Sequence, residues 1–263
     1  MKDYIYELER QGFEVESLCH AYSILSVDFS AELEQLYLSL RDLELPITEI
    51  IGSGGGETKF TQRLRRRLSS EHWKKHNFII EKIVDGRSQN FTSHEIDHVK
   101  HKPGMGTIAC EIEWNNKDPF FDRDLENFKR LHSEGAINVG IIITRGRSLQ
   151  NSLADAVYAF IERHDINSFK DLERHGYYPT AKQREKVERQ TRRIKNPLTF
   201  RDSWVRNFIS NKYGQATTHW SKLMDRIERG VGHPCPLLII GLPSSMICID
   251  NNLIENLDEN DEE

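Results

Sequence analysis

Cysteine is scarce in this sequence, with four in 263 residues, and the spacing of those four excludes two common uses. None of them forms a CxxC pair or has histidine partners at zinc spacing. We therefore expect neither disulfides nor a zinc site. The sequence also lacks an apolar run of the roughly 18 residues that a membrane span requires, and its N-terminus lacks a signal-peptide core. These absences predict a cytoplasmic protein that does not enter a membrane.

A nucleotide-binding loop is missing as well. The glycine-rich stretch 51–57 has neither the Gly-Lys-Ser/Thr ending of a P-loop nor GxGxxG spacing. The net charge of −5 is low for a protein that binds nucleic acid, but its distribution is uneven. Residues 250–263 contain seven acids and no base, and removing these seven charges from −5 leaves the rest of the chain at +2. We expect this acidic tail to be disordered.

The most informative stretch is 107–114, in which Glu111 and Glu113 alternate with apolar residues. In an extended strand both carboxylates point to one face, and the other face can be buried. Asp97 lies 14 residues before Glu111 in another short alternating segment. If the two segments pair, three carboxylates converge, which is costly unless a cation neutralises them. Oxygen ligands suit Mg²⁺ or Mn²⁺. The alternative is that both glutamates form the solvated face of an edge strand.

The residues after this segment indicate a βαβ unit. A polar turn at 115–119 precedes a helical apolar stripe over 120–132, and 139–144 is a β-branched run typical of a buried strand. Strand, turn, helix and strand in this order place the acids at the mouth of the unit.

The remaining segments are mostly helical. The sequence predicts a strand and turn at 13–27, a helix at 30–43, a basic helix at 58–69, a hairpin of 78–84 with 92–99, helices at 149–163, 168–175, 182–194, 199–209 and 221–229, and a strand within 235–243.

This order of segments resembles the type II restriction endonucleases of the BglII, BamHI and BstYI kind, within the PD-(D/E)XK nuclease superfamily. The resemblance rests on Asp97, on Glu111-Ile112-Glu113 and the βαβ unit that follows, on residues 213–243, and more weakly on 59–75. It implies an α/β fold with a central mixed sheet flanked by helices. It also implies a single endonuclease domain over 1–249, with a helical insertion at about 147–212, where the likeness fails.

The resemblance further implies Mg²⁺-dependent hydrolysis of a phosphodiester, with Mn²⁺ as a substitute. Asp97, Glu111 and Glu113 would be the catalytic residues, and the metal ligands would be the first two carboxylates and the Ile112 carbonyl. Many superfamily members carry lysine where this chain has Glu113. A carboxylate there can accept a proton from water or hold a second metal, which leaves one-metal and two-metal catalysis open.

Base reading would come from two loops beside the acids. By resemblance, the first contains Asn115, Asn116, Lys117, Asp118 and Arg123, and the second contains Gln215, Thr217, Thr218 and His219. For the two threonines, the alternative is N-capping of the helix at 221–229. The basic stretch 182–206, with Arg192 and Arg193, predicts a helical arm that embraces DNA. A capping subdomain or a dimerisation helix pair is the other reading of this insertion.

A palindromic duplex is read most simply by a homodimer. By resemblance, the helix at 120–132 is the candidate dimer contact, and the alternative is that its apolar side is ordinary core. The resemblance also implies a GATC-containing site, 5′ overhangs and a cognate DNA methyltransferase as genetic partner. Two other functions remain open: a sequence-nonspecific or structure-specific repair nuclease with the same acids, and a non-catalytic DNA-binding protein.

Overall fold

The computed structural model describes residues 3–52 and 57–249. The acidic tail and most of the glycine-rich stretch lie outside these residues, so the expected disorder of the tail stays a prediction. The chain divides into two compact units. Unit 1 contains residues 1–43, 61–147 and 216–243, and unit 2 contains 44–60, 148–215 and 244–263.

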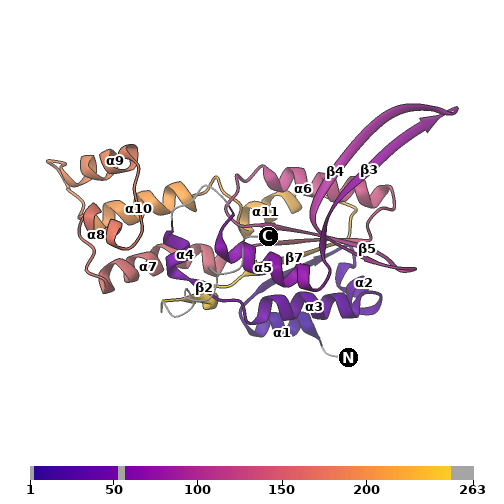
Figure 1. The fold of residues 1–263 in the computed structure, drawn as a ribbon, viewed down its shortest axis with the longest axis horizontal. Helices are drawn as coiled ribbons and strands as arrows, with labels where there is room; N and C mark the ends of the chain where they lie inside the picture. Colours follow the sequence, from indigo (N-terminus) through magenta and orange to yellow (C-terminus); the bar gives the residue numbers. More distant parts are fainter. Residues whose placement is uncertain (1–2, 53–56, 250–263) are drawn as a thin grey trace, which may run out of the picture. The chain divides into compact units, whose positions relative to one another are not determined.

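Unit 1 is organised around a mixed β-sheet (Figure 1). Within the described ranges this sheet has six strands in the order β1-β7-β6-β5-β4-β3. Their bounds are β1 Glu14–Leu18, β3 Lys74–Val84, β4 Arg87–Lys102, β5 Gly106–Glu113, β6 Val139–Arg145 and β7 Leu237–Leu242. The strands β5, β6 and β7 are parallel neighbours, and the outer pairs are antiparallel. The expected central mixed sheet is therefore confirmed.

The βαβ unit consists of β5, α6 (Phe120–Ser133) and β6. The apolar stripe of α6 is buried in the core of unit 1, where Phe121, Leu125 and Phe128 are fully enclosed. Gly140 allows the close approach of α6 to the sheet, because a Cβ there would lie 2.5 Å from the Phe128 ring. The apolar side of this helix is thus ordinary core in this chain.

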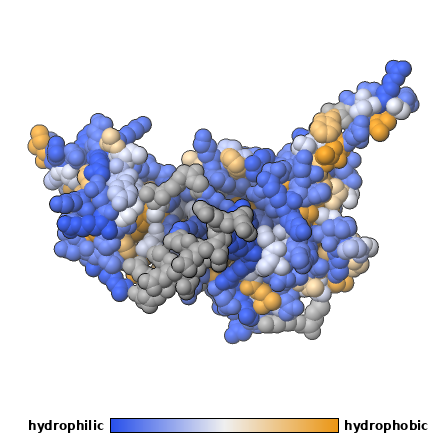
Figure 2. Space-filling model, viewed as in Figure 1, coloured by the Kyte–Doolittle hydropathy of each residue, from blue (hydrophilic) through white to orange (hydrophobic). Residues whose placement is uncertain are grey.

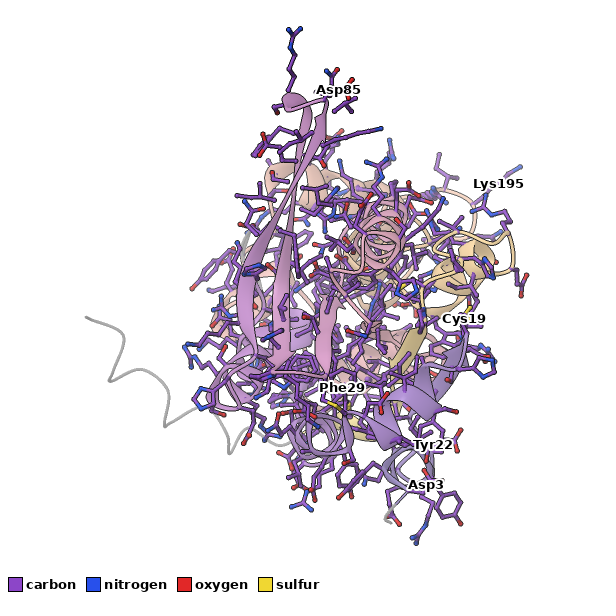
Figure 3. All side chains as sticks on the ribbon, turned by 90° about the vertical axis from the view of Figure 1, so that its right-hand side faces the viewer. Asp3, Cys19, Tyr22, Phe29, Asp85 and Lys195 are labelled. Carbon is purple, nitrogen blue, oxygen red and sulfur yellow. The ribbon has the colours of Figure 1, made fainter. Side chains whose placement is uncertain are left out.

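The hairpin of β3 and β4 is longer than predicted and projects beyond the rest of the sheet as an arm (Figure 1). Its turn is at Asp85 and Gly86, both with positive φ, and Asp85 lies at its tip (Figure 3). The large apolar side chains of Ile79, Ile83 and Phe91 are each more than 60% exposed, and hydrophobic surface is visible along the arm in Figure 2. The prediction of a hairpin that carries Asp97 is confirmed.

The other helices of unit 1 are α1 (Tyr4–Arg10), α2 (Ala21–Val27), α3 (Ser30–Arg41), most of α5 (Lys59–Ser70) and α11 (Trp220–Ile227). The strand and turn predicted within 13–27 are present as β1 and a turn at residues 19–20, but the sequence did not predict α2, which follows them. Ala21 and Leu25 are four residues apart and both fully buried, which is the spacing of one helical face.

Unit 2 contains the predicted helices of the insertion: all but the first residue of α7 (Arg147–Arg163), α8 (Phe169–Arg174), α9 (Ala181–Thr191) and α10 (Phe200–Lys212). Thr180 begins α9 with a capping box, and Trp204 stacks on Phe208 with ring centroids 5.0 Å apart. The sequence did not predict that α4 (Ile47–Ile51) and a two-stranded parallel sheet of β2 (Leu45–Pro46) and β8 (Ile247–Cys248) belong to this unit. Among the described helices of the chain, none is both long enough and apolar enough to cross a membrane.

Candidate active site

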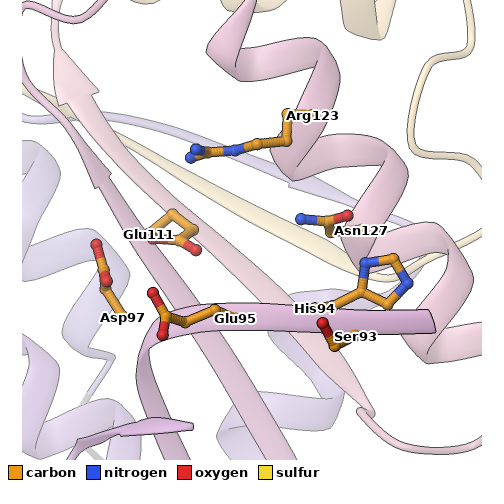
Figure 4. A pocket seen from close by; sticks show the side chains of 7 residues that line it. All are labelled: Ser93, His94, Glu95, Asp97, Glu111, Arg123 and Asn127. Carbon is orange, nitrogen blue, oxygen red and sulfur yellow. The ribbon is translucent and has the colours of Figure 1, made fainter. Parts of the chain in front are cut away.

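The pairing of β4 with β5 brings two of the predicted acids together. His98 lies opposite Cys110 in this antiparallel pair, so Asp97 and Glu111 occupy the next positions along the two strands. Both side chains line one cavity of about 350 Å³ (Figure 4). Its other lining residues are Ser93, His94, Glu95, Arg123 and Asn127.

Glu111 is an unusual carboxyl because it is buried without a partner. Its side chain is 4% exposed, and no hydrogen bond or ion pair to it occurs among the described residues. Burial, and after it the neighbouring carboxyls of Asp124, Asp97 and Glu113, together raise the pKa of Glu111 to about 9. A carboxylate is stable in such a place only when a cation is close to it.

Glu113 is also buried, but it has partners and does not line the cavity. Its Oε2 accepts a hydrogen bond of 2.8 Å from Asn116 Nδ2, and its Oε1 lies 3.6 Å from Arg123 Nη2. Burial and the neighbouring Asp124 raise the pKa of Glu113 to about 8. The structure therefore places Asp97 and Glu111 in the cavity and Glu113 next to it.

Asp124 belongs to this cluster, and sequence reasoning missed it. The residue lies on α6 and is fully buried, and burial raises its pKa. Its Oδ1 lies 2.8 Å from Arg123 Nε and 2.7 Å from Arg123 Nη2. The only signal in the sequence was an acid directly beside Leu125 in the apolar stripe of a helix.

Sequence reasoning also missed Glu95, which lines the cavity, and Lys75, which is paired with it. The Lys75 ammonium is 2.6 Å from Glu95 Oε1 and 3.9 Å from Asp97 Oδ1. The β3–β4 pairing is irregular between Lys74 and His76, and Lys75 lies there across from the part of β4 that contains Asp97. Bulges of this kind re-aim side chains beside active sites, and their position could not be read from the sequence.

The two predicted reading loops pair with each other. Lys117 and Thr217 form an isolated antiparallel bridge, and the Thr218 amide donates to the Asn116 carbonyl at 2.8 Å. Asn116 and Lys117 are exposed, while Asn115, Asp118 and Thr217 are partly buried and Thr218 and His219 are buried. Gln215 is exposed and belongs to unit 2.

Two buried arginines hold these loops. Arg145, which is fully buried, donates to the carbonyls of Trp114 at 2.7 Å and Thr218 at 2.6 Å. It also donates to the Thr217 hydroxyl at 2.7 Å. Arg226 Nη2 lies 2.8 Å from Asp122 Oδ2 and 3.4 Å from Asp118 Oδ2. Because charged donors bind several loop acceptors at once, both loops are held firmly in place.

His219 is the N-cap residue of α11, and its side chain makes no capping hydrogen bond. The N-capping interpretation of Thr217 and Thr218 was therefore wrong. Burial, followed by the charge of Arg145, lowers the pKa of His219 to about 4, so its ring is neutral at physiological pH.

Arg192 and Arg193 lie at the end of α9 in unit 2, where both are exposed. Arg192 pairs with Glu188 at 3.1 Å, one helical turn before it.

The cavity fits a divalent cation held partly by protein. In the described parts of the chain, no three His, Cys, Asp or Glu side chains form a ready-made metal site. Asp97 and Glu111 offer two carboxylates, and the cavity leaves room for water and phosphate oxygens. Mg²⁺ is commonly bound in this way, through one or two carboxylates with water and phosphate as the remaining ligands.

The sequence of the chain matches the family model described as restriction endonuclease BglII/BglIII over residues 13–242. That range includes the cavity, both loops and the two arginines that hold them. No curated protein matches the chain.

Proposed function

Because the chain belongs to the restriction endonuclease family BglII/BglIII, we propose that it cuts both strands of palindromic DNA at a specific sequence, with Mg²⁺ as cofactor. Membership of the family makes it a site-specific deoxyribonuclease, a hydrolase that acts on DNA. Restriction endonucleases of this kind generally use divalent metal ions. The observation that carries the choice of active site is Glu111, a buried carboxyl without a partner that faces the same cavity as Asp97.

Asp97 and Glu111 would hold the cation, together with the Ile112 carbonyl. When bound, Mg²⁺ or Mn²⁺ supplies positive charge at the phosphate and lowers the pKa of the attacking water. Water adds to phosphorus and one P–O ester bond breaks, leaving a phosphate on one strand end and a hydroxyl on the other. By resemblance, Glu113, which lies beside the cavity and 3.6 Å from Arg123 Nη2, would accept the water's proton or hold a second metal.

Base reading would use the exposed surface of the paired loops. Asn116 can pair bidentately with adenine and Lys117 can contact guanine, each discriminating by about 1–3 kcal/mol. Thr217, Asn115 and Asp118 would complete this surface. The burial of Thr218 and His219 suits them to holding the loop in place. Gln215, which belongs to unit 2, is a proposed DNA contact by resemblance alone.

The remaining proposals follow from the family. A homodimer would present one active site to each DNA strand. The protein would act in the cytoplasm, and a cognate DNA methyltransferase would be its genetic partner. Residues 1–249 would act as one endonuclease domain, and the exposed Arg192 and Arg193 would contact DNA phosphates. We propose a GATC-containing site and 5′ overhangs by resemblance.

Digestion of a plasmid of known sequence with Mg²⁺ tests the function. We expect discrete fragments, and sequencing of their ends would give the site and the cut position. Asp97→Ala or Glu111→Ala should abolish cutting, while sequence-specific binding in Ca²⁺ persists. A smear would instead support a nonspecific repair nuclease, and intact plasmid bound at defined sites would support a non-catalytic DNA-binding protein.

A further inference from the structure

We infer that Arg123 binds the phosphate that is cleaved, rather than a base edge, and that Asp124 is the positioning residue that aims it. This inference rests on the proposed function. It concerns a cation and a buried acid that lie in the cavity region but are not needed to hold the metal.

The orientation of the Arg123 guanidinium is fixed by Asp124. Nε and Nη2 of Arg123 lie 2.8 and 2.7 Å from the same oxygen, Oδ1 of Asp124. Two contacts to one oxygen set the plane of the guanidinium as well as its position. Asp124 is fully buried on α6, so the anchor itself has little freedom. The Phe120 ring, 4.5 Å from the guanidinium carbon, covers another part of the group.

The unused part of the guanidinium is available to the cavity. Arg123 lines the cavity together with Asp97 and Glu111 (Figure 4). Its side chain is 53% exposed. In the part of the chain that the structure describes, Nη1 forms no hydrogen bond or ion pair. Nη2 also lies 3.6 Å from Glu113 Oε1, which keeps the group among the catalytic acids and away from a base edge.

The charge balance favours a phosphate as the ligand of Nη1. Asp97 and Glu111 line the cavity, Glu113 and Asp124 lie next to it, and DNA would bring a further negative charge. Two positively charged side chains partly balance these negative charges. They are Lys75 on β3, which is paired with Glu95, and Arg123 on α6. The planar fork of arginine matches phosphate oxygens well, and an anchored donor stabilises the charge that grows on them during hydrolysis.

The test compares Arg123→Ala with Arg130→Ala, a matched control on the same helix. Arg130 is 55% exposed and pairs with Glu126 at 3.0 Å, but it does not line the cavity. Single-turnover cleavage would be measured on a duplex that contains the mapped site, and DNA affinity would be measured in Ca²⁺. We expect Arg123→Ala to slow cleavage by about 10²–10³-fold, with affinity and site preference within about threefold of wild type. Arg130→Ala should behave as wild type.

Asp124→Asn tests the positioning role. The amide keeps the shape and one acceptor oxygen but loses the charge, so we expect a slower rate with unchanged affinity. Combined with Arg123→Ala, it should add little, because residues that act as a unit are not additive. If the fold-reduction in cleavage rate of the double variant equals the product of the two single reductions, Asp124 acts independently of Arg123. That result would overturn the assignment of Asp124 as the residue that positions Arg123.

Duplexes with sulfur in place of either non-bridging oxygen at the cut phosphate identify the contact. In wild type, one of the two stereoisomers should be cut more slowly, and Arg123→Ala should reduce that difference. If wild-type protein cuts while Arg123→Ala cuts equally fast, the inference fails and the proposed function stands. Loss of site preference instead of rate would make Arg123 a base reader and overturn the inference. If wild-type protein does not cut any DNA, the proposed function itself fails.

Discussion

Glu111→Gln should stabilise the metal-free protein at alkaline pH. Glutamine keeps the shape of the side chain without its charge. The carboxyl of Glu111 has a pKa of about 9 in the folded chain, against 4.5 for the ordinary group. Below pH 4.5 it is protonated in both the folded and the unfolded chain. Between pH 4.5 and 9 the unfolded chain gives up a proton that the folded chain retains, so wild-type stability falls as pH rises.

The size of this effect can be estimated between pH 5 and pH 8. Three pH units inside that window correspond to at most roughly 4 kcal/mol. Because the cavity is open to water, which lowers the cost of charge, we expect roughly 2 kcal/mol, or about 4–8 °C in Tm.

Thermal unfolding in EDTA at pH 5 and at pH 8 would measure this difference in stability between Glu111→Gln and wild type. The Tm of Glu111→Gln should be higher than that of wild type, and this difference should be larger at pH 8 than at pH 5. In the control variant Glu134→Gln, which changes an exposed residue, the Tm difference from wild type should not depend on pH. Adding Ca²⁺ at pH 8 should raise the Tm of wild type and leave that of Glu111→Gln unchanged. Equal Tm differences at both pH values, or a less stable variant at pH 8, would refute the claim that this carboxyl is buried without a partner.

Four other results are expected. Binding of Mn²⁺ should release about one proton per site at pH 7.5 because the cavity holds a protonated carboxyl; calorimetry in two buffers of different ionisation enthalpy would detect it, and equal heats would contradict it. Arg145→Met should lower the free energy of unfolding by roughly 3 kcal/mol because three acceptors lose their donor; an unchanged urea midpoint would argue against the loop clamp. Asn116→Ala should reduce discrimination at one base pair by about 1–3 kcal/mol, measured by competition binding in Ca²⁺, whereas a uniform loss over all sequences would mean a phosphate contact. Neutralising Arg192 and Arg193 together should make the salt dependence of binding shallower by about 0.9 log unit per lost contact, and an unchanged slope would favour a capping role for the insertion.

The pairing of Asp97 with Glu111 could be predicted because strand alternation fixes the face on which a side chain lies. In two short segments whose acids alternate with apolar residues, few pairings place the acids of both on the same face. The strands β4 and β5 pair in such a way. The helix and the parallel strand after them followed from hydrophobic periodicity in the same way.

The supporting residues could not be predicted, because each depends on a contact between segments far apart in the sequence. Arg145 reaches Thr217 across 72 residues, and neither neighbourhood shows that it contains a buried ion. Lys75 lies across from the part of β4 that contains Asp97 where the register is irregular, which a hydrophobic pattern does not encode. Asp124 was hidden because a single acid beside an apolar stripe ordinarily points to solvent.

Anomalous scattering from a crystal grown with Mn²⁺ would test the central claim most directly. The account predicts a Mn²⁺ peak between the carboxylates of Asp97 and Glu111, about 2.2 Å from an oxygen of each. A peak elsewhere in the chain, with these two carboxyls left without a cation, would contradict it.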